Sequence, residues 1–289
     1  MTEAKSYTLD VPGAVVTYDV RESEPPGGPV LMLVGQPMGA SGFQALGAYF
    51  PDRTVVTYDP RGTSRSRLTE PVSQIEVRQH ADDLYRIITE LGRGAVDIFG
   101  SSGGAVTSLE LVARHPEAVR TLVAHEPPSI KVLPDAEALA AVMADLRDTY
   151  QRDGFGAGMA KFIAFTSVKG EVPADFASRP APDPAMFGLP TEDDGTRDDS
   201  LLGLNIISIP GHEPDFEALR AAPTRIVIGA GRESEGEMAH RGGLGVAARL
   251  GQEAVIFPSH HGGFLDESSG YAGEPEAFAA TLRQVLETP

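Results

Sequence analysis

Apolar and polar residues alternate along residues 6–20, which predicts two short antiparallel strands separated near Pro12 and Gly13. Further along the chain, short apolar runs replace this alternation. Such runs are typical of strands buried on both faces of a sheet. The predicted strands lie at residues 30–34, 54–58, 96–99, 119–124, 224–228 and 254–257.

Helical patterns lie between these runs. From about residue 74 to 91 the apolar positions follow a 3.6-residue period, which ends at Gly92. Further helices are expected around 43–50, from Gly103 onward, over 237–250 and over 275–287. Strands that alternate with helices indicate an α/β fold, with a mostly parallel twisted sheet flanked by helices.

The alternation of predicted strands and helices stops between residues 127 and 222. Helical patterns at 136–150 and 158–166 are followed there by a stretch rich in Pro and Asp. We interpret 127–222 as an inserted helical cap, or lid, and 1–126 with 223–289 as the core. The apolar residues of the cap either line a pocket or pack the cap against the sheet. They are Phe155, Met159, Phe162, Ile163, Phe165, Met186 and Phe187.

Composition narrows the functional classes. The 289 residues carry a net charge of −17, which repels nucleic acid and anionic membranes. The chain contains no cysteine, so disulfides, thiolate metal sites and a cysteine nucleophile are excluded. We found neither an apolar signal segment nor a membrane-spanning run, and no nucleotide-binding fingerprint. We therefore expect a cytoplasmic monomer or homodimer that needs no cofactor and no metal.

The most informative motif is Gly-x-Ser-x-Gly, formed by Gly100, Ser102 and Gly104 between a predicted strand and a predicted helix. A turn this tight brings backbone against backbone, so small residues must flank the serine. The turn lifts the Ser102 hydroxyl out of the sheet, and the helix that opens at Gly103 points free N–H groups toward it. The alternative interpretation is a strand-to-helix turn in which the serine only caps the helix.

From residue 30 to the end of the chain, apart from the cap, these landmarks resemble the α/β-hydrolase family, and in particular its cap-containing serine esterases and lipase-like members. The resemblance implies that Ser102 is the nucleophile. Val34-Gly35-Gln36-Pro37 is similar to the family's His-Gly-x-Pro loop, with Val34 where histidine is usual. The resemblance then implies an oxyanion hole made by the backbone N–H groups of Gln36 and Gly103. The segment from Asp59 to Gly62 looks like the family's structural Asp-x-Arg-Gly.

The general base is expected after the last strand, in Pro258-Ser259-His260-His261-Gly262-Gly263-Phe264. By similarity to family loops of the form x-His-Gly-Gly-Phe we assign His261, with His260 as the competing choice. The other histidines are expected at the surface or at helix ends. They are His80, His115, His125, His212 and His240.

The acid departs from the family's common pattern, which places an aspartate in Gly-x-x-Asp after the seventh strand. Here that stretch begins at Gly231 and has Ser234 at the carboxylate position. The other known location is the end of the sixth strand, where Glu126 closes an apolar run. We assign Glu126, with Glu233 and Glu235 in reserve.

Together these residues predict a serine hydrolase that cleaves a small or medium carboxylic ester through an acyl-enzyme on Ser102. The same triad supports cofactor-free perhydrolase (haloperoxidase) activity. A second alternative is a catalytically silent ligand-binding protein of the same fold, because a histidine and an aspartate are missing from their usual places.

Overall fold

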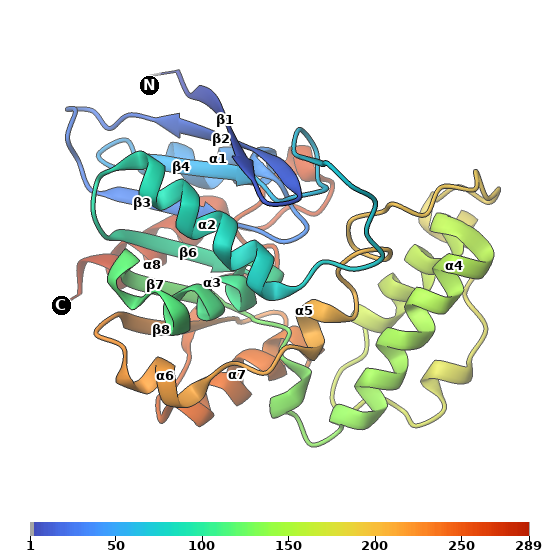
Figure 1. Ribbon diagram of the computed structural model, residues 1–289. Helices are drawn as coiled ribbons and strands as arrows, with labels where there is room; N and C mark the ends of the chain where they lie inside the picture. Colours follow the sequence, from blue (N-terminus) through green and yellow to red (C-terminus); the bar gives the residue numbers. More distant parts are fainter. Residues whose placement is uncertain (1–2, 289) are drawn as a thin grey trace.

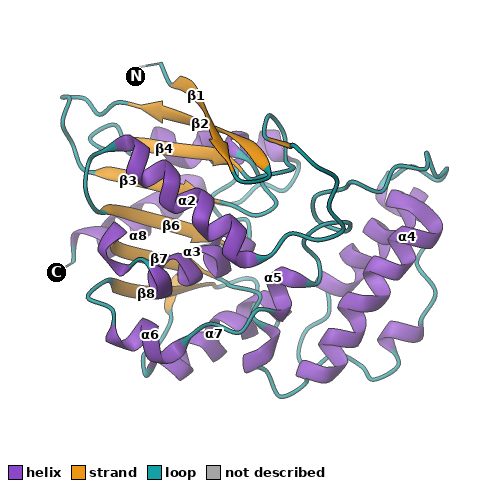
Figure 2. Cartoon of the chain, in the orientation of Figure 1, coloured by secondary structure: helices purple, strands orange, loops and turns teal. Residues whose placement is uncertain are grey.

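A computed structural model of the protein describes residues 3–288 (Figures 1 and 2). The strands are β1 (Lys5–Val11), β2 (Ala14–Arg21), β3 (Val30–Val34), β4 (Thr54–Asp59), β5 (Arg67–Leu68), β6 (Val96–Ser101), β7 (Val119–His125), β8 (Arg225–Gly231) and β9 (Val255–Phe257). The α-helices are α1 (Gln44–Ala48), α2 (Val77–Leu91), α3 (Gly103–Arg114), α4 (Ala136–Thr166), α5 (Ser208–Gly211), α6 (Phe216–Ala221), α7 (Met238–Leu250) and α8 (Pro275–Glu287).

The strands form one sheet in the order β1-β2-β4-β3-β6-β7-β8-β9, and the short β5 pairs with β2. The alternating segment at residues 6–20 gives the antiparallel pair β1 and β2, and β2 is also antiparallel to β4. All pairs from β4 to β9 are parallel. The predicted α/β fold with a mostly parallel sheet is therefore confirmed.

Helices cover both faces of the sheet because successive residues of a strand point to opposite sides (Figure 2). In β3, Leu31 and Leu33 pack with residues of α1 and α8, whereas Val30, Met32 and Val34 pack with residues of α2 and α3. These five residues are all buried. A strand between two helical layers needs apolar residues at every position, which explains the continuous apolar runs.

The segment between β7 and β8 is helical and irregular, and α4 lies beyond one end of the strands (Figure 1). The two helical pieces expected there are joined in α4, whose backbone leaves the helical conformation at Gly154 (φ 86°). At the end of the segment, α6 buries Phe216 and Leu219 in the core beside α3. The core–cap division at residues 126–127 and 222–223 stays a prediction. No helix within residues 3–288 has the length and apolar character needed to cross a membrane.

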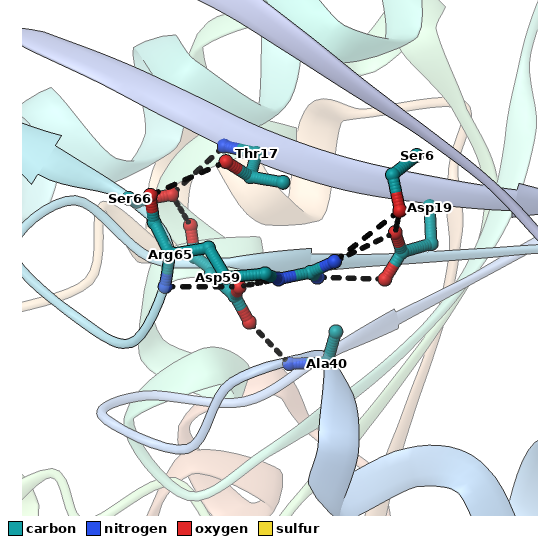
Figure 3. Close-up of polar contacts among 7 residues, drawn as sticks. All are labelled: Ser6, Thr17, Asp19, Ala40, Asp59, Arg65 and Ser66. Atoms are coloured by element: carbon teal, nitrogen blue, oxygen red, sulfur yellow. Dashed lines mark hydrogen bonds and ion pairs between the residues drawn. The ribbon is translucent and has the colours of Figure 1, made fainter.

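A buried carboxylate connects the loop after β3 to the first strands (Figure 3). Asp59 accepts hydrogen bonds from the backbone N–H of Ala40, at 2.8 Å, and from Nε of Arg65, at 2.6 Å. Arg65 also pairs with Asp19 of β2 at 2.7 Å, and the Ser66 hydroxyl donates to the Asp59 carbonyl. Asp59 thereby fixes the end of the loop that carries Gln36, in agreement with the structural role expected for this segment.

Candidate active site

Ser102 occupies the sharp turn between β6 and α3. Its backbone has φ 57° and ψ −127°, a conformation that costs free energy for any residue with a Cβ. The backbone N–H of Ser102 donates to the carbonyl of His125, at the end of the neighbouring β7, at 2.9 Å. The strained turn is therefore held by the sheet, and the Ser102 side chain lines a cavity at the carboxyl ends of the strands.

Close backbone contacts explain the glycines of the motif. A Cβ at Gly104 would overlap the carbonyl group of Val34, and a Cβ at Gly100 would lie 2.9 Å from the carbonyl oxygen of Gly104. Real Cβ atoms do not approach other atoms this closely, so both positions require glycine. The Gly-x-Ser-x-Gly spacing thus brings α3 directly against the loop after β3.

The structure joins two of the predicted site residues by a short hydrogen bond. Nδ1 of His261, in the loop after β9, lies 2.5 Å from Oε2 of Glu126, the residue after β7. Since Nδ1 is engaged with a carboxylate, Nε2 is the ring nitrogen available to exchange a proton. His261 and Ser102 line the same cavity.

The other oxygen of Glu126 has two donors from the end of β8. Oε1 accepts from the backbone N–H of Gly231, at 2.7 Å, and from the hydroxyl of Ser234. Glu126 is fully buried, with φ 47°. Burial acts to raise the pKa of Glu126, but the hydrogen bond and charge of His261, with the bond from Ser234, outweigh it and lower this pKa to about 2. The carboxylate is therefore ionised throughout the neutral range.

The partner histidine responds in the opposite direction. Burial acts to lower the pKa of His261, but the hydrogen bond from its ring to Glu126 and the charge of that carboxylate raise it above its usual value. Glu237, a second carboxylate lining the cavity, adds to the same effect. A histidine with a raised pKa is a stronger base toward a hydroxyl proton.

The competing candidates lie in other contacts. His260 is held in its own loop, where Nδ1 accepts from the backbone N–H of Gly262 at 3.1 Å and Nε2 lies 3.0 Å from the carbonyl of Ala272. The side chains of Glu233 and Glu235 are exposed. Of the predicted bases and acids, His261 and Glu126 are the ones that the structure brings together.

The residues of the predicted oxyanion hole lie side by side. A Cβ at Gly103 would lie 2.7 Å from the carbonyl oxygen of Gln36, and both residues line the cavity next to Ser102. Gly103 is the first residue of α3, so its N–H has no acceptor within the helix. Val34, which stands where the family usually has histidine, is a fully buried residue of β3.

The cavity has a volume of about 670 Å³ and lies between the core and α4. Phe162 and Ile163 of α4 line it, as two of the candidate cap residues. Phe165 instead packs against Phe176 inside the cap segment, and Met186 is 76% exposed. These four residues therefore divide between the wall of the cavity, the interior of the segment between β7 and β8, and the surface.

The expectation of a position at the surface or at a helix end is wrong for His125, which is fully buried at the end of a strand. His80 lies near the start of α2, but it is also fully buried. His125 is the last residue of β7 and packs against Phe257 and Phe278, at ring-centroid distances of 5.5 and 5.2 Å. Burial lowers the pKa of His80 and of His125 to about 4. Both rings are therefore neutral at neutral pH.

His80 connects the cap segment to the loop after β3. Its Nε2 lies 2.8 Å from Oδ1 of Asn205 and 3.2 Å from Nε2 of Gln36. Asn205 also donates to the carbonyl of Ser200, at 2.6 Å. The residue whose N–H is predicted to bind the oxyanion is thus positioned by a polar network that includes α2 and the segment before α5.

Comparisons with known proteins show which family this chain resembles. The family model described as alpha/beta hydrolase fold matches residues 28–200. The uncharacterized hydrolase YraK of Bacillus subtilis (strain 168) is 30% identical over 288 residues, which covers 97% of this chain and 95% of the relative. The putative carbamate hydrolase RutD of Caulobacter vibrioides is 32% identical over 117 residues, which covers 37% of this chain and 42% of that protein.

Two solved structures extend the comparison to the whole fold. An enol-lactonase from Burkholderia xenovorans LB400 has a TM-score of 0.67 at 16% identity and covers 98% of this chain and 100% of its own. The esterase EaEST from Exiguobacterium antarcticum has a TM-score of 0.66 at 19% identity, with both chains covered in full. The matches to the family model and to YraK, together with the fold, show that this chain belongs to the α/β-hydrolase family.

Proposed function

We propose that the protein is a serine hydrolase that cleaves small or medium carboxylic esters, with Ser102 as nucleophile, His261 as general base and Glu126 as the acid that orients it. The observation that carries the proposal is the 2.5 Å hydrogen bond between His261 and Glu126, beside a serine in a strained turn of the same cavity. Residues 127–222 act as a cap that closes this cavity over the core.

The first half of the reaction acylates the enzyme. A serine hydroxyl is a weak nucleophile at neutral pH, so Nε2 of His261 takes its proton as Oγ of Ser102 attacks the ester carbonyl carbon. The carbonyl oxygen becomes an oxyanion and accepts hydrogen bonds from the N–H groups of Gln36 and Gly103, each worth about 3 kcal/mol in the transition state. The tetrahedral intermediate collapses, the alcohol leaves with the proton from His261, and the acyl group stays on Ser102.

The second half reverses the roles of the same groups. Water replaces the alcohol, gives a proton to Nε2 of His261 and attacks the acyl carbon. The second intermediate expels Oγ of Ser102, which recovers its proton, and the carboxylic acid leaves. Throughout, Glu126 stays ionised and stabilises the cationic imidazole without taking its proton.

The relatives support hydrolysis of a carbonyl compound. One protein with the same fold is named as an enol-lactonase and another as an esterase, and RutD is named as a putative carbamate hydrolase. At 16% and 19% identity the solved structures carry only the fold, so the substrate class proposed for this chain rests on its own site.

Labelling with a fluorophosphonate, followed by peptide mapping, tests the proposal. We expect a stoichiometric adduct on Ser102 that is lost in His261→Ala and retained in His260→Ala. Hydrolysis of a p-nitrophenyl ester by the wild type, and its absence in Ser102→Ala, completes the test. A folded protein that forms no adduct and melts at a higher temperature with a small ligand would identify a silent binding protein instead.

A further inference from the structure

One carboxylate in the cavity has no role in the proposed reaction. Glu237 is the residue before α7 and lines the cavity together with His261 and Tyr271. It is partly buried, and its side chain forms no hydrogen bond or ion pair with the residues that the structure describes. A carboxylate that is partly removed from water gains free energy from any donor or cation brought next to it.

The surroundings of Glu237 do not neutralise it. Within residues 3–288, the lining of the cavity contains no lysine and no arginine. Burial and the charge of Glu126 raise the pKa of Glu237, while His261, Lys169 and His260 act in the opposite direction. Lys169 is exposed and lies outside the lining. The cavity therefore combines mainly apolar walls with one carboxylate and with no lysine or arginine in its described lining.

Tyr271 is a second polar residue in the lining of the same cavity. Burial raises the pKa of the Tyr271 phenol, and the negative charge of Glu237 acts in the same direction. The ring of Tyr271 packs on His260, with centroids 3.9 Å apart. Tyr271 thus adds a phenol oxygen, which can accept a hydrogen bond, to the cavity that Glu237 lines.

We propose that the cavity selects esters that carry an alkylammonium group, and that this group pairs with the carboxylate of Glu237. Apolar walls accept the alkyl part of such a molecule, and the negative charge at one side accepts the cation. An ester with a carboxylate at the same place is disfavoured, because it would lie against Glu237, and the described lining contains no lysine or arginine to pair with it. This inference rests on the proposed function of Ser102.

Pairs of esters with the same shape and different charge test the proposal. Acetylcholine is compared with 3,3-dimethylbutyl acetate, which replaces the charged nitrogen by carbon in the alcohol. The p-nitrophenyl ester of 4-(trimethylammonio)butanoate is compared with that of 5,5-dimethylhexanoate, which makes the same change in the acyl group. We expect kcat/KM to favour the cationic member of at least one pair by about two- to fivefold, the range of a partly solvated ion pair.

Glu237→Gln removes the charge and keeps the shape, so it should abolish that ratio. The matched control is Glu235→Gln, which removes an exposed charge from the same segment and should leave the ratio unchanged. Added salt should reduce the wild-type ratio, because screening weakens the pair. Equal rates for both members of both pairs, or a ratio that survives Glu237→Gln, would overturn the proposal while the serine mechanism stands.

Protection against fluorophosphonate labelling covers the case in which these esters turn over slowly. Choline should protect Ser102 at a concentration about two- to fivefold lower than 3,3-dimethylbutanol does, and Glu237→Gln should remove the difference. Equal protection, or none by either compound, contradicts the selection for cations. A protein that forms no adduct at all contradicts the proposed function itself, which separates the two failures.

Discussion

Ser234 donates a hydrogen bond from its hydroxyl to Oε1 of Glu126, and it does so from the position at which α/β hydrolases commonly carry an aspartate. The two side chains follow neighbouring parallel strands, β8 and β7, so their ends meet at one edge of the sheet. In this chain the carboxylate of Glu126 follows one strand, and the hydroxyl of Ser234 that donates to it follows the neighbouring strand.

We expect Ser234→Ala to lower kcat/KM by about three- to tenfold, because a buried carboxylate loses one of its donors. The remaining charge of Glu126 then acts more strongly on His261, so the pH at which activity rises should move upward. A pH–rate profile measures this midpoint. A loss of stability with an unchanged midpoint would mean that Ser234 only packs the site.

Because β7 and β8 are neighbours, the carboxylate that contacts His261 can be moved from the end of one strand to the end of the other by substitution. Glu126→Gln should lower kcat by about 10⁴-fold and shift the activity midpoint down, because the charge that raises the pKa of His261 is gone. Adding Ser234→Asp to this variant should recover at least about tenfold of the loss, since it places a carboxylate at the end of β8. Glu235→Gln serves as the control and should leave kcat nearly unchanged. Steady-state rates that fall with Glu235→Gln and survive Glu126→Gln would assign the acid elsewhere.

The buried histidines predict how stability depends on pH. Their pKa is about 4 in the folded protein and about 6.5 when unfolded, so the unfolded state binds more protons as the pH falls below 6.5. Stability should therefore decrease from pH 6.5 toward pH 4.5, by about 1.4 kcal/mol per pH unit for each of His80 and His125. The pKa of His261 is shifted in the opposite direction, so the stability that this residue contributes is complete below pH 6.5 and is lost as the pH rises above that value. Urea unfolding across this range should show half the slope in His125→Phe.

The glycine at the elbow predicts a sharp steric effect. Gly104→Ala should destabilise the fold by about 1 to 3 kcal/mol, because the added methyl group overlaps the Val34 carbonyl. Gly211→Ala is the matched control, since a Cβ there meets no atom within 4 Å. If the denaturant midpoint shifts equally in the two variants, the overlap with the Val34 carbonyl is not the cause of the destabilisation.

Two aspartate–arginine pairs of similar geometry should differ in their contribution to stability. Asp59→Asn should cost about 2 kcal/mol, since the carboxylate is buried and also holds the N–H of Ala40. Asp52→Asn breaks the pair with Arg283 at 2.7 Å, but Asp52 is about half exposed, so the cost should stay below about 1 kcal/mol. Thermal melting of both variants provides the comparison, and equal losses would show that burial does not decide the effect.

Periodicity predicted the sheet and its principal helices well, because a strand between two helical layers must be apolar throughout and a surface helix must be apolar on one face. It missed β5 and α6, which are too short to show a period. The joined helix α4 was expected as two pieces because Gly154 and its neighbours interrupt the pattern.

The site was predictable only in part. Gly-x-Ser-x-Gly and the strand end at Glu126 indicated positions along the chain, and the structure brings Glu126 to His261, although their catalytic roles stay predictions. The hydrogen bond that Ser234 donates to Glu126 could not be predicted from the sequence, because it depends on β7 and β8 being neighbours in the sheet. The burial of His125 had a signal, since this residue extends an apolar run of β7.

The chain between β7 and β8 is longer than the sheet requires. Two neighbouring parallel strands need one crossover helix, and α6 supplies it. Everything from Pro127 to the start of α6, including α4, can vary in length or be exchanged without changing the pairing of a strand, provided that the contact between Asn205 and His80 is kept. The range of ligands that the cavity accepts is therefore open to recombination: one contiguous segment, replaced as a unit, redesigns most of the far wall of the cavity and leaves Ser102, Glu126 and His261 in place.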